Sequence, residues 1–389
     1  MKLSVPHISR KDLRSVGNVL KSGWISTSSK TVDLFEKKLS KFCKTKYSIV
    51  LNSGTSAIHL ALKILGVNKN SEVIVPSLTF IATVNPVLYL GAKPIIFDVD
   101  QHHNLNIKDV INFINEKTIF KNKKTINKKT KKIIKVIIVA HMWGRACNFT
   151  ELKNLCKKRN ILILEDAAEA LGSYIKGKNY NHCGSVGDLG CLSFNANKII
   201  TTGSGGAIIT NSKKFFDKVQ YLANQAKDDT FNYIHNECGY NYKMNSISAA
   251  LGISQLRRLK KKINLRKKIY ERYLFNFKNS KDIQILSYEN KSKTNYWMNV
   301  ISFKKLNFKQ TYNLSLSLAK KKIQTRRIWR PLNLQIYLKK FQTYKIENAK
   351  KIYFSSLCLP SDDNITNSDV DKISNHIKKF YEIIVNNKL

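Results

Sequence analysis

The chain has 389 residues, of which 43% are hydrophobic, and this length favours two domains over a single core. Its 68 lysines and arginines stand against 26 acidic residues, so the formal net charge is +42. Only 11 of the basic residues are arginine, the residue best suited to forked contacts with phosphates and base edges, so we expect no nucleic-acid partner. A small anionic substrate would still be attracted by the positive field.

The apolar runs and the cysteines of the sequence indicate the cellular compartment of the protein. No apolar run reaches the roughly 18 residues that span a bilayer, and the first residues, MKLSVPHISRKDLRSVG, lack the apolar core of a secretory signal. The seven cysteines include no CxxC pair, which favours reduced thiols over a disulfide framework or a zinc site. We therefore expect a cytoplasmic protein with no membrane partner and no metal.

Short apolar runs alternate with helix-length segments through the first 250 residues. Strands are predicted at 47–52, 73–76, 94–100, 133–141 and 161–166, and helices at 53–66, 79–91 and 149–158. The lysine-rich run before the fourth strand, 121–135, is interpreted as a solvated loop. Strands that are apolar throughout and are joined by helices predict an α/β fold with a parallel sheet covered on both faces.

The pattern changes after residue 250. A long amphipathic helix is predicted at 255–277, and shorter mixed elements follow it. We therefore expect two domains, a large one over residues 1–252 and a smaller C-terminal α/β domain over residues 253–389.

Three segments of the large domain bear on chemistry. The first, Ser53-Gly54-Thr55-Ser56, joins a strand to a helix, which suits either an anion site or an ordinary helix cap. In the second, Asp166 follows a buried strand, at the edge where open α/β sheets bind ligands, although it could also cap a helix. The third sets Lys198 among small and hydroxyl-bearing residues, between Ser193 and the turn-forming GSGG.

Together these segments provide what pyridoxal 5′-phosphate (PLP) requires. That cofactor needs an anchor for its phosphate, an anion that keeps its pyridine nitrogen protonated, and an amine that forms a Schiff base with its aldehyde. The combination is more specific than any of the three segments alone.

The chain also resembles, over nearly its whole length, the PLP-dependent sugar-nucleotide aminotransferases of the DegT family. The resemblance rests on segments that occur in the family's order: SGWISTSSKTVDLFEKKL, LNSGTSAIHLAL, VIVPSLTFIATVNPV, EDAAEALGS, GDLGCLSFNANKIITTGSGGAI, QAKDDTFNYIHNECGYNYKMNSISAALG and IQTRRIWRPLN. It implies the aspartate aminotransferase-like fold of PLP enzymes, fold type I. Two segments, SFNANKIITTGSGG and QAKDDTFNYIHNE, look most like the legionaminic acid and bacillosamine branch.

The resemblance implies a role for individual residues. Lys198 matches the lysine that bonds to the cofactor and then moves protons, and Asp166 matches the acid paired with the pyridine nitrogen. The other matched positions are Glu169 near the ring hydroxyl, Thr55, Ser56 and Ser193 at the phosphate, Phe80 stacked on the ring, Asn241 reaching the partner subunit's phosphate, and Arg326 and Trp329 on the substrate side.

The implied reaction moves an amino group from glutamate to carbon 4 of a nucleotide-linked 4-keto-6-deoxy-N-acetylhexosamine, for surface-glycan sugars. The role of Asn241 implies a homodimer with shared active sites. Three departures from the family pattern, Lys243, Arg327 and Asn333, bear on substrate and dimer contacts.

Other functions stay open at this point. A GDP-linked 4-keto-6-deoxyhexose without the N-acetyl group, as in perosamine formation, is the alternative acceptor. A regulatory relative without turnover, or a basic nucleic-acid-binding protein on the same fold, would be no enzyme at all. The family's dehydratase branch has histidine at the position of Lys198, which argues against that reaction.

Overall fold

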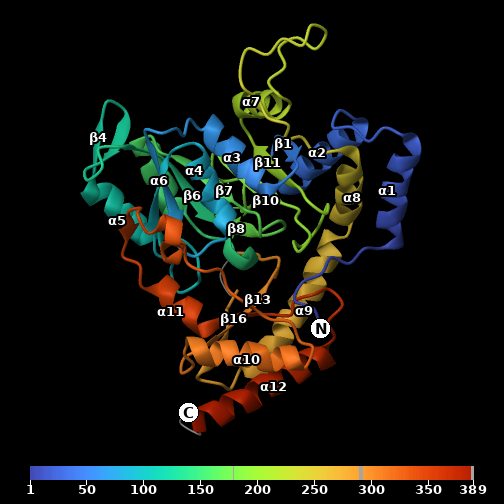
Figure 1. Cartoon of the computed structure of the whole chain (residues 1–389), viewed down its shortest axis with the longest axis vertical. Helices are drawn as coiled ribbons and strands as arrows, with labels where there is room; N and C mark the ends of the chain where they lie inside the picture. Colours follow the sequence, from blue (N-terminus) through green and yellow to red (C-terminus); the bar gives the residue numbers. More distant parts are fainter. Residues whose placement is uncertain (178, 289–291, 387–389) are drawn as a thin grey trace.

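The computed structural model describes residues 1–177, 179–288 and 292–386. A mixed, mostly parallel sheet of ten strands lies in the upper half of the molecule, and a smaller four-stranded sheet lies below it (Figure 1). The large sheet contains β1 (Tyr47–Leu51), β2 (Ser71–Pro76), β3 (Lys93–Phe97), β4 (Thr118–Lys121), β5 (Lys124–Asn127), β6 (Ile133–Ala140), β7 (Leu162–Asp166), β10 (Leu189–Ser193), β11 (Gly206–Thr210) and β15 (Thr343–Tyr344).

Its main path runs β1-β11-β10-β7-β6-β2-β3-β15. Pairing is parallel from β10 through β7, β6, β2 and β3 to β15, whereas β11 is antiparallel to both of its neighbours. The expected mostly parallel sheet is thereby confirmed.

Helices cover both faces of this sheet, so its strands are apolar on both sides. Neighbouring residues of β6 and β7 belong to separate hydrophobic clusters: Ile137 and Ile163 to one, Ile138 and Leu164 to the other. The surrounding helices are α1 (Arg10–Ser22), α2 (Lys30–Cys43), α3 (Gly54–Ile64), α4 (Asn85–Tyr89), α5 (Ile107–Lys117), α6 (Thr150–Arg159), α7 (Lys213–Ala223) and α8 (Ser246–Arg257).

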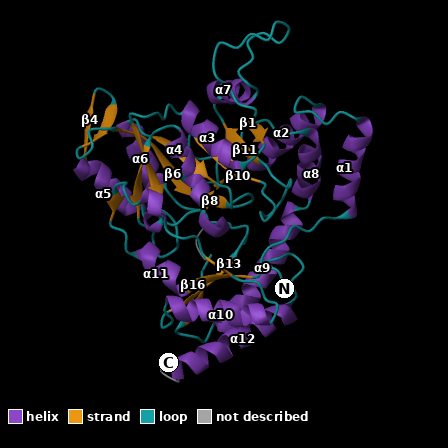
Figure 2. Cartoon of the chain, viewed as in Figure 1, coloured by secondary structure: helices purple, strands orange, loops and turns teal. Residues whose placement is uncertain are grey.

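Most of the C-terminal third, apart from β15 and the segments beside it, lies in the lower half (Figure 2). Its four-stranded antiparallel sheet has the order β12 (Ile283–Ile285), β13 (Asn299–Phe303), β16 (Ser356–Leu359) and β14 (Arg326–Arg327). Its helices are α9 (Leu259–Phe277), α10 (Phe308–Lys320), α11 (Asn348–Ser355) and α12 (Asn367–Asn386). The predicted boundary after residue 252 falls within α8, and the division into two domains remains a prediction.

Two local features complete the fold. The run 121–135 was expected as a loop, but it contains the turn and second strand of the hairpin β4–β5 and the start of β6. The hairpin forms because Asn122 and Lys123 both adopt the positive φ of a tight turn. A separate small ribbon pairs β8 (Tyr174–Lys176) with β9 (Tyr180–His182). Within the described residues, no helix combines the length and the apolar character needed to cross a bilayer.

Candidate active site

A cavity of about 330 Å³ opens at the carboxyl ends of parallel strands β2, β6 and β7. The loops after these strands, the start of α3 and the segment after β14 form its walls. Eight of the ten sequence-predicted site residues line it: Thr55, Phe80, Asp166, Glu169, Ser193, Lys198, Arg326 and Trp329. Because carboxyl ends of parallel strands meet at one sheet edge, residues far apart in sequence converge there.

Lys198 lies in the turn between β10 and β11. Its ammonium Nζ is 3.4 Å from Glu169 Oε1 and 4.2 Å from the centre of the Trp297 ring. The side chain is only 11% exposed. An amine held in this way faces both a carboxylate and an aromatic ring while it lines the cavity.

Asp166 is the last residue of β7, and its carboxylate is fixed by two donors. The Thr83 hydroxyl donates to Oδ2 over 2.7 Å, and the Ala168 N–H donates to Oδ1 over 3.2 Å. Thr79 forms a further hydroxyl contact with Thr83. The carboxylate is therefore aimed by the loop after β2 as well as by its own strand.

Glu169 is buried three residues further along. Its Oε2 accepts the backbone N–H of Trp143 over 2.7 Å, and its Oε1 accepts the indole N–H of Trp329 over 3.3 Å. Burial raises the pKa of this carboxyl above its ordinary value, although the charge of Lys198 and the Trp143 N–H act in the opposite direction. Glu169 is therefore a buried carboxyl in direct contact with the Lys198 amine.

The start of α3 forms a cradle suited to an anion. The helix begins at Gly54, and its first N–H groups have no partners within the helix. A Cβ added at Gly54 would lie 3.0 Å from the Cβ of Ser193, and one at Gly206 would lie 2.5 Å from the carbonyl carbon of Ser53. Glycine therefore lets β10, β11 and the start of α3 approach closely enough to bring Thr55 and Ser193 to one wall.

Two predicted residues do not line the cavity. The Ser56 hydroxyl points to its own turn, where it donates to Asn52 Oδ1 over 2.7 Å and contacts Ser53 Oγ. Asn241 is exposed, and its carbonyl accepts the side-chain N–H of Asn52. The two residues lie close together in the fold because both contact Asn52.

The mouth of the cavity is aromatic and basic. Phe80 is 48% exposed, and its ring centre lies 5.1 Å from that of Trp329. Arg326 is exposed in β14 and lines the cavity as well. The adjacent Arg327 points elsewhere, with its guanidinium 3.7 Å from the centre of the Phe308 ring.

The other two departures from the family pattern have different surroundings. Lys243 Nζ lies 2.9 Å from both Glu36 Oε1 and Gln220 Oε1, so it pairs within its own chain. Asn333 belongs to the short 3₁₀ helix Leu332–Leu334, just beyond the Trp329 segment. Neither residue lines the cavity.

Three further residues shape the site, although the sequence did not identify them. His141 is buried in the cavity wall, where its Nε2 bonds Glu165 Oε2 over 2.8 Å. Like Asp166, it stands at the carboxyl end of an apolar strand, and that position could have identified it. Thr83 lies in the family-like segment VIVPSLTFIATVNPV, but only the fold shows that it contacts Asp166, and Trp297 lies in none of the matching segments.

Other titratable groups near the site are held in place by the fold. Glu165 accepts the backbone N–H groups of Gly184, Val186 and Gly187 and also contacts His141. These contacts lower the pKa of Glu165 more than burial raises it, so the pKa lies below its ordinary value.

Across the described part of the chain, His, Cys, Asp and Glu form no group of three that could hold a metal ion.

Known proteins share both the sequence and this fold. The chain is 33% identical to a GDP-perosamine synthase of Escherichia coli O157:H7, over 97% of each chain. It is 32% identical to a UDP-4-amino-4,6-dideoxy-N-acetyl-beta-L-altrosamine transaminase of Campylobacter jejuni, over 91% of this chain and 90% of that one. Helicobacter pylori PseC, an aminotransferase involved in the biosynthesis of pseudoaminic acid, superposes with a TM-score of 0.87 at 26% identity, over 97% and 98% of the two chains.

The family assignment covers almost the whole chain, since residues 6–378 match the DegT/DnrJ/EryC1/StrS aminotransferase family. Solved structures with the same fold include a PLP form. The chain therefore belongs to this family and is a PLP-dependent sugar-nucleotide aminotransferase of fold type I.

Proposed function

We propose that the protein transfers an amino group from glutamate to carbon 4 of a nucleotide-linked 4-keto-6-deoxyhexose. One observation carries the proposal: Lys198, Asp166 and the start of α3 converge on a single cavity. Their chemistry matches the three requirements of PLP, and the cradle formed at Gly54 suits the cofactor's phosphate. The residues present therefore fit the cofactor.

Each residue of the cavity has its own role in the proposed reaction. Bound PLP supplies an electron sink that stabilises negative charge on the donor's α-carbon. Lys198 would hold the cofactor's aldehyde through its amine and, once released, would take the proton from that α-carbon and deliver it to the cofactor. Asp166 keeps the pyridine nitrogen protonated, and Glu169 faces the ring hydroxyl.

The remaining roles concern binding. Thr55 and Ser193 hold the phosphate from the cavity wall, and Ser56 shares this role only when its hydroxyl leaves Asn52, to which it donates. Phe80 stacks on the cofactor ring. Arg326 and Trp329, at the mouth, contact the nucleotide sugar, because a guanidinium suits a diphosphate and an indole suits a sugar ring.

Two acceptors are candidates. The segments SFNANKIITTGSGG and QAKDDTFNYIHNE favour an N-acetylated hexosamine of the legionaminic acid or bacillosamine type. The similarity to a GDP-perosamine synthase favours a GDP-linked hexose without the N-acetyl group. Parallel assays with a UDP-linked 4-keto-6-deoxy-N-acetylhexosamine and with a GDP-linked 4-keto-6-deoxyhexose separate the two, since release of 2-oxoglutarate reports turnover.

The cofactor and donor are tested by visible absorption. We expect the purified chain with PLP to show the band of a lysine Schiff base, and glutamate to bleach it. Lys198→Ala should show neither the band nor the bleaching. A wild-type chain without the band, or a Lys198→Ala variant that turns over normally, would refute the proposal.

We further propose a homodimer in which Asn241 reaches the partner subunit's phosphate. Each active site would then use Lys198 of one subunit and Asn241 of the other, so Lys198→Ala and Asn241→Ala would remove residues that different subunits supply. Mixing the two variants under conditions that exchange subunits should restore about a quarter of wild-type activity, because half of the dimers are mixed and each has one intact site. No recovery on mixing would contradict a shared site.

A further inference from the structure

Trp297 contacts the Lys198 turn although it belongs to the C-terminal third, just before β13. Its side chain is fully buried. The ring centre lies 4.2 Å from Lys198 Nζ, and the indole N–H donates to the carbonyl of Asn197 over 2.9 Å. One side chain therefore contacts both the ammonium of the lysine and the backbone immediately before it.

The environment of Lys198 explains why an aromatic ring suits this position. The ammonium is nearly enclosed, and an enclosed charge is unfavourable unless it is compensated. Glu169 provides one partner at 3.4 Å, but its carboxylate also accepts the N–H groups of Trp143 and Trp329. The face of an indole attracts a cation without any proton equilibrium of its own.

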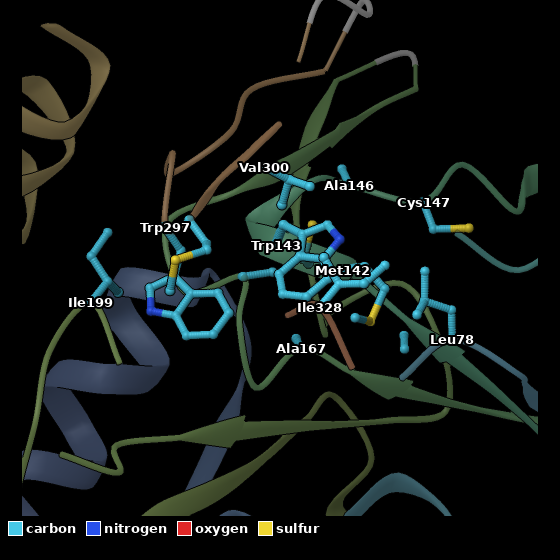
Figure 3. Close-up of a cluster of buried hydrophobic side chains, with 14 of the residues drawn as sticks. Leu78, Met142, Trp143, Ala146, Cys147, Ala167, Ile199, Trp297, Val300 and Ile328 are labelled. Atoms are coloured by element: carbon cyan, nitrogen blue, oxygen red, sulfur yellow. The ribbon is translucent and has the colours of Figure 1, made fainter. Parts of the chain in front are cut away.

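The ring is held rigidly in this orientation. It stacks on Trp143 with ring centres 6.4 Å apart and planes within 10°, and Figure 3 shows the two indoles side by side among buried apolar residues. The carbonyl of Trp297 accepts Arg266 Nη1 over 2.6 Å, which ties the residue to α9. The Arg266 contact fixes the backbone, and the ring cannot turn away from Lys198 without losing its stacking on Trp143 and its bond to the Asn197 carbonyl.

We propose that Trp297 is a positioning residue for Lys198. Its ring face holds the ammonium whenever the lysine is not bonded to the cofactor, and its indole N–H fixes the turn that presents the lysine. This inference rests on the proposal that Lys198 bonds to PLP. It assigns to the C-terminal third a direct part in orienting the reactive amine.

The test measures how the full chain, stripped of cofactor, captures added PLP. The rate is followed by the appearance of the Schiff-base band. Binding of pyridoxamine phosphate, which has no aldehyde and forms no bond to the lysine, is titrated separately. At a pH where the amine is neutral, we expect Trp297→Leu to slow capture about tenfold, because the turn that presents the lysine is no longer fixed, and to leave pyridoxamine phosphate affinity within about twofold of wild type.

Three variants separate the possible roles. Trp297→Phe retains a ring face and should stay within about threefold of the wild-type capture rate. Ser4→Ala removes the other donor to the Asn197 carbonyl, a contact of 3.1 Å, without touching the ring. Phe303→Leu removes a buried aromatic side chain from β13, the strand that follows Trp297, and should change neither readout.

A shape-preserving series protects the test against misfolding of the leucine variant. Fluorinated tryptophans placed at position 297 keep the indole N–H and the shape of the ring but weaken its attraction for cations. The neutral amine that attacks the aldehyde should then form at lower pH, so the pH of half-maximal capture should fall with each added fluorine. A wild-type capture rate in Trp297→Leu together with an unchanged pH profile in this series, or equal losses in Phe303→Leu, would overturn the inference. Failure of the wild-type chain to form the band would instead refute the proposed role of Lys198.

Discussion

At the scale of single residues, two carboxyl groups of the cavity are each held in place by neighbouring side chains and backbone N–H groups. Asp166 is fixed by the Thr83 hydroxyl and the Ala168 N–H, whereas Glu169 is buried between Lys198, Trp143 and Trp329. Two carboxyls only three positions apart therefore have different surroundings, and the roles proposed for them differ accordingly.

Thr83→Val should lower kcat about tenfold, because it removes the hydroxyl that donates to Asp166 and so loosens the carboxylate. Thr79→Val is the matched control, since Thr79 contacts Thr83 but not Asp166. Steady-state kinetics with saturating glutamate and acceptor measure both variants. Equal losses in the two variants would show that the hydroxyl contact to Asp166 is not the cause.

Glu169 gives the stability of the cofactor-free chain a specific pH dependence. Burial raises its folded-state pKa above the ordinary 4.5, so above pH 4.5 the folded chain keeps a proton that the unfolded chain has lost. The contribution of Glu169 to stability is therefore greatest at low pH and falls as pH rises toward its folded pKa. Glu169→Gln lacks this proton.

Urea unfolding of the wild type and Glu169→Gln between about pH 4 and about pH 8 tests this dependence. The free energy of unfolding of the wild type minus that of the variant should fall as pH rises above 4.5, and then level off. Subtraction removes the contributions of the other titrating groups. A difference that stays constant or rises with pH would contradict a raised pKa.

At the scale of elements, the site depends on how closely α3, β10 and β11 approach. Gly206 is the first residue of β11 and lies beside Ser53, the N-cap of α3. A Cβ added at Gly206 would lie 2.6 Å from the backbone nitrogen of Gly54. Backbone atoms cannot yield as the end of a flexible side chain can. The geometry of the anion cradle is therefore set by the packing of these elements as well as by its hydroxyl groups.

Gly206→Ala should weaken PLP binding about tenfold and destabilise the chain by about 1–3 kcal/mol, because the added methyl group pushes α3 away from the sheet. PLP titration and urea unfolding measure the two effects. Gly17→Ala in α1 is the control, since nothing lies within 4 Å of its added Cβ. If Gly206→Ala bound PLP normally, the close approach would not shape the cradle.

At the scale of the whole molecule, the two sheets depend on one another. Strand β15, from the C-terminal third, pairs with β3 of the large sheet, and the Ser361 N–H donates to the Leu3 carbonyl near the start of the chain. Arg326 and Trp329 complete a cavity whose other walls belong to the large sheet. Neither part alone would form the site.

The net charge of +42 acts over the same scale. We expect the KM for the nucleotide sugar to rise several-fold between about 0.02 M and 0.3 M salt, with kcat nearly constant, because salt screens the field that attracts the anion. Initial rates at varied ionic strength measure this, and sucrose at matched osmolality is the uncharged control. A KM independent of salt would show that the lysine excess does not assist binding.

The α/β class and the mostly parallel sheet follow from the sequence alone, because apolar strands are local patterns. Asp166 and Lys198 stand in long segments that match a known family. Phe80 and Ser193 line the same cavity as these two residues, and the roles of all four at the cofactor remain predictions.

Tertiary structure decided which residues support that chemistry. Thr83 reaches Asp166 across 83 positions, and Trp297 lies 99 positions after Lys198, so no local pattern could link either pair. The turn at Asn122 and Lys123, which converted an expected loop into a hairpin, lacks the glycine that marks most such turns. Sequence patterns report the periodicity and chemistry of neighbours along the chain, whereas burial, orientation and close approach arise only when distant segments pack together.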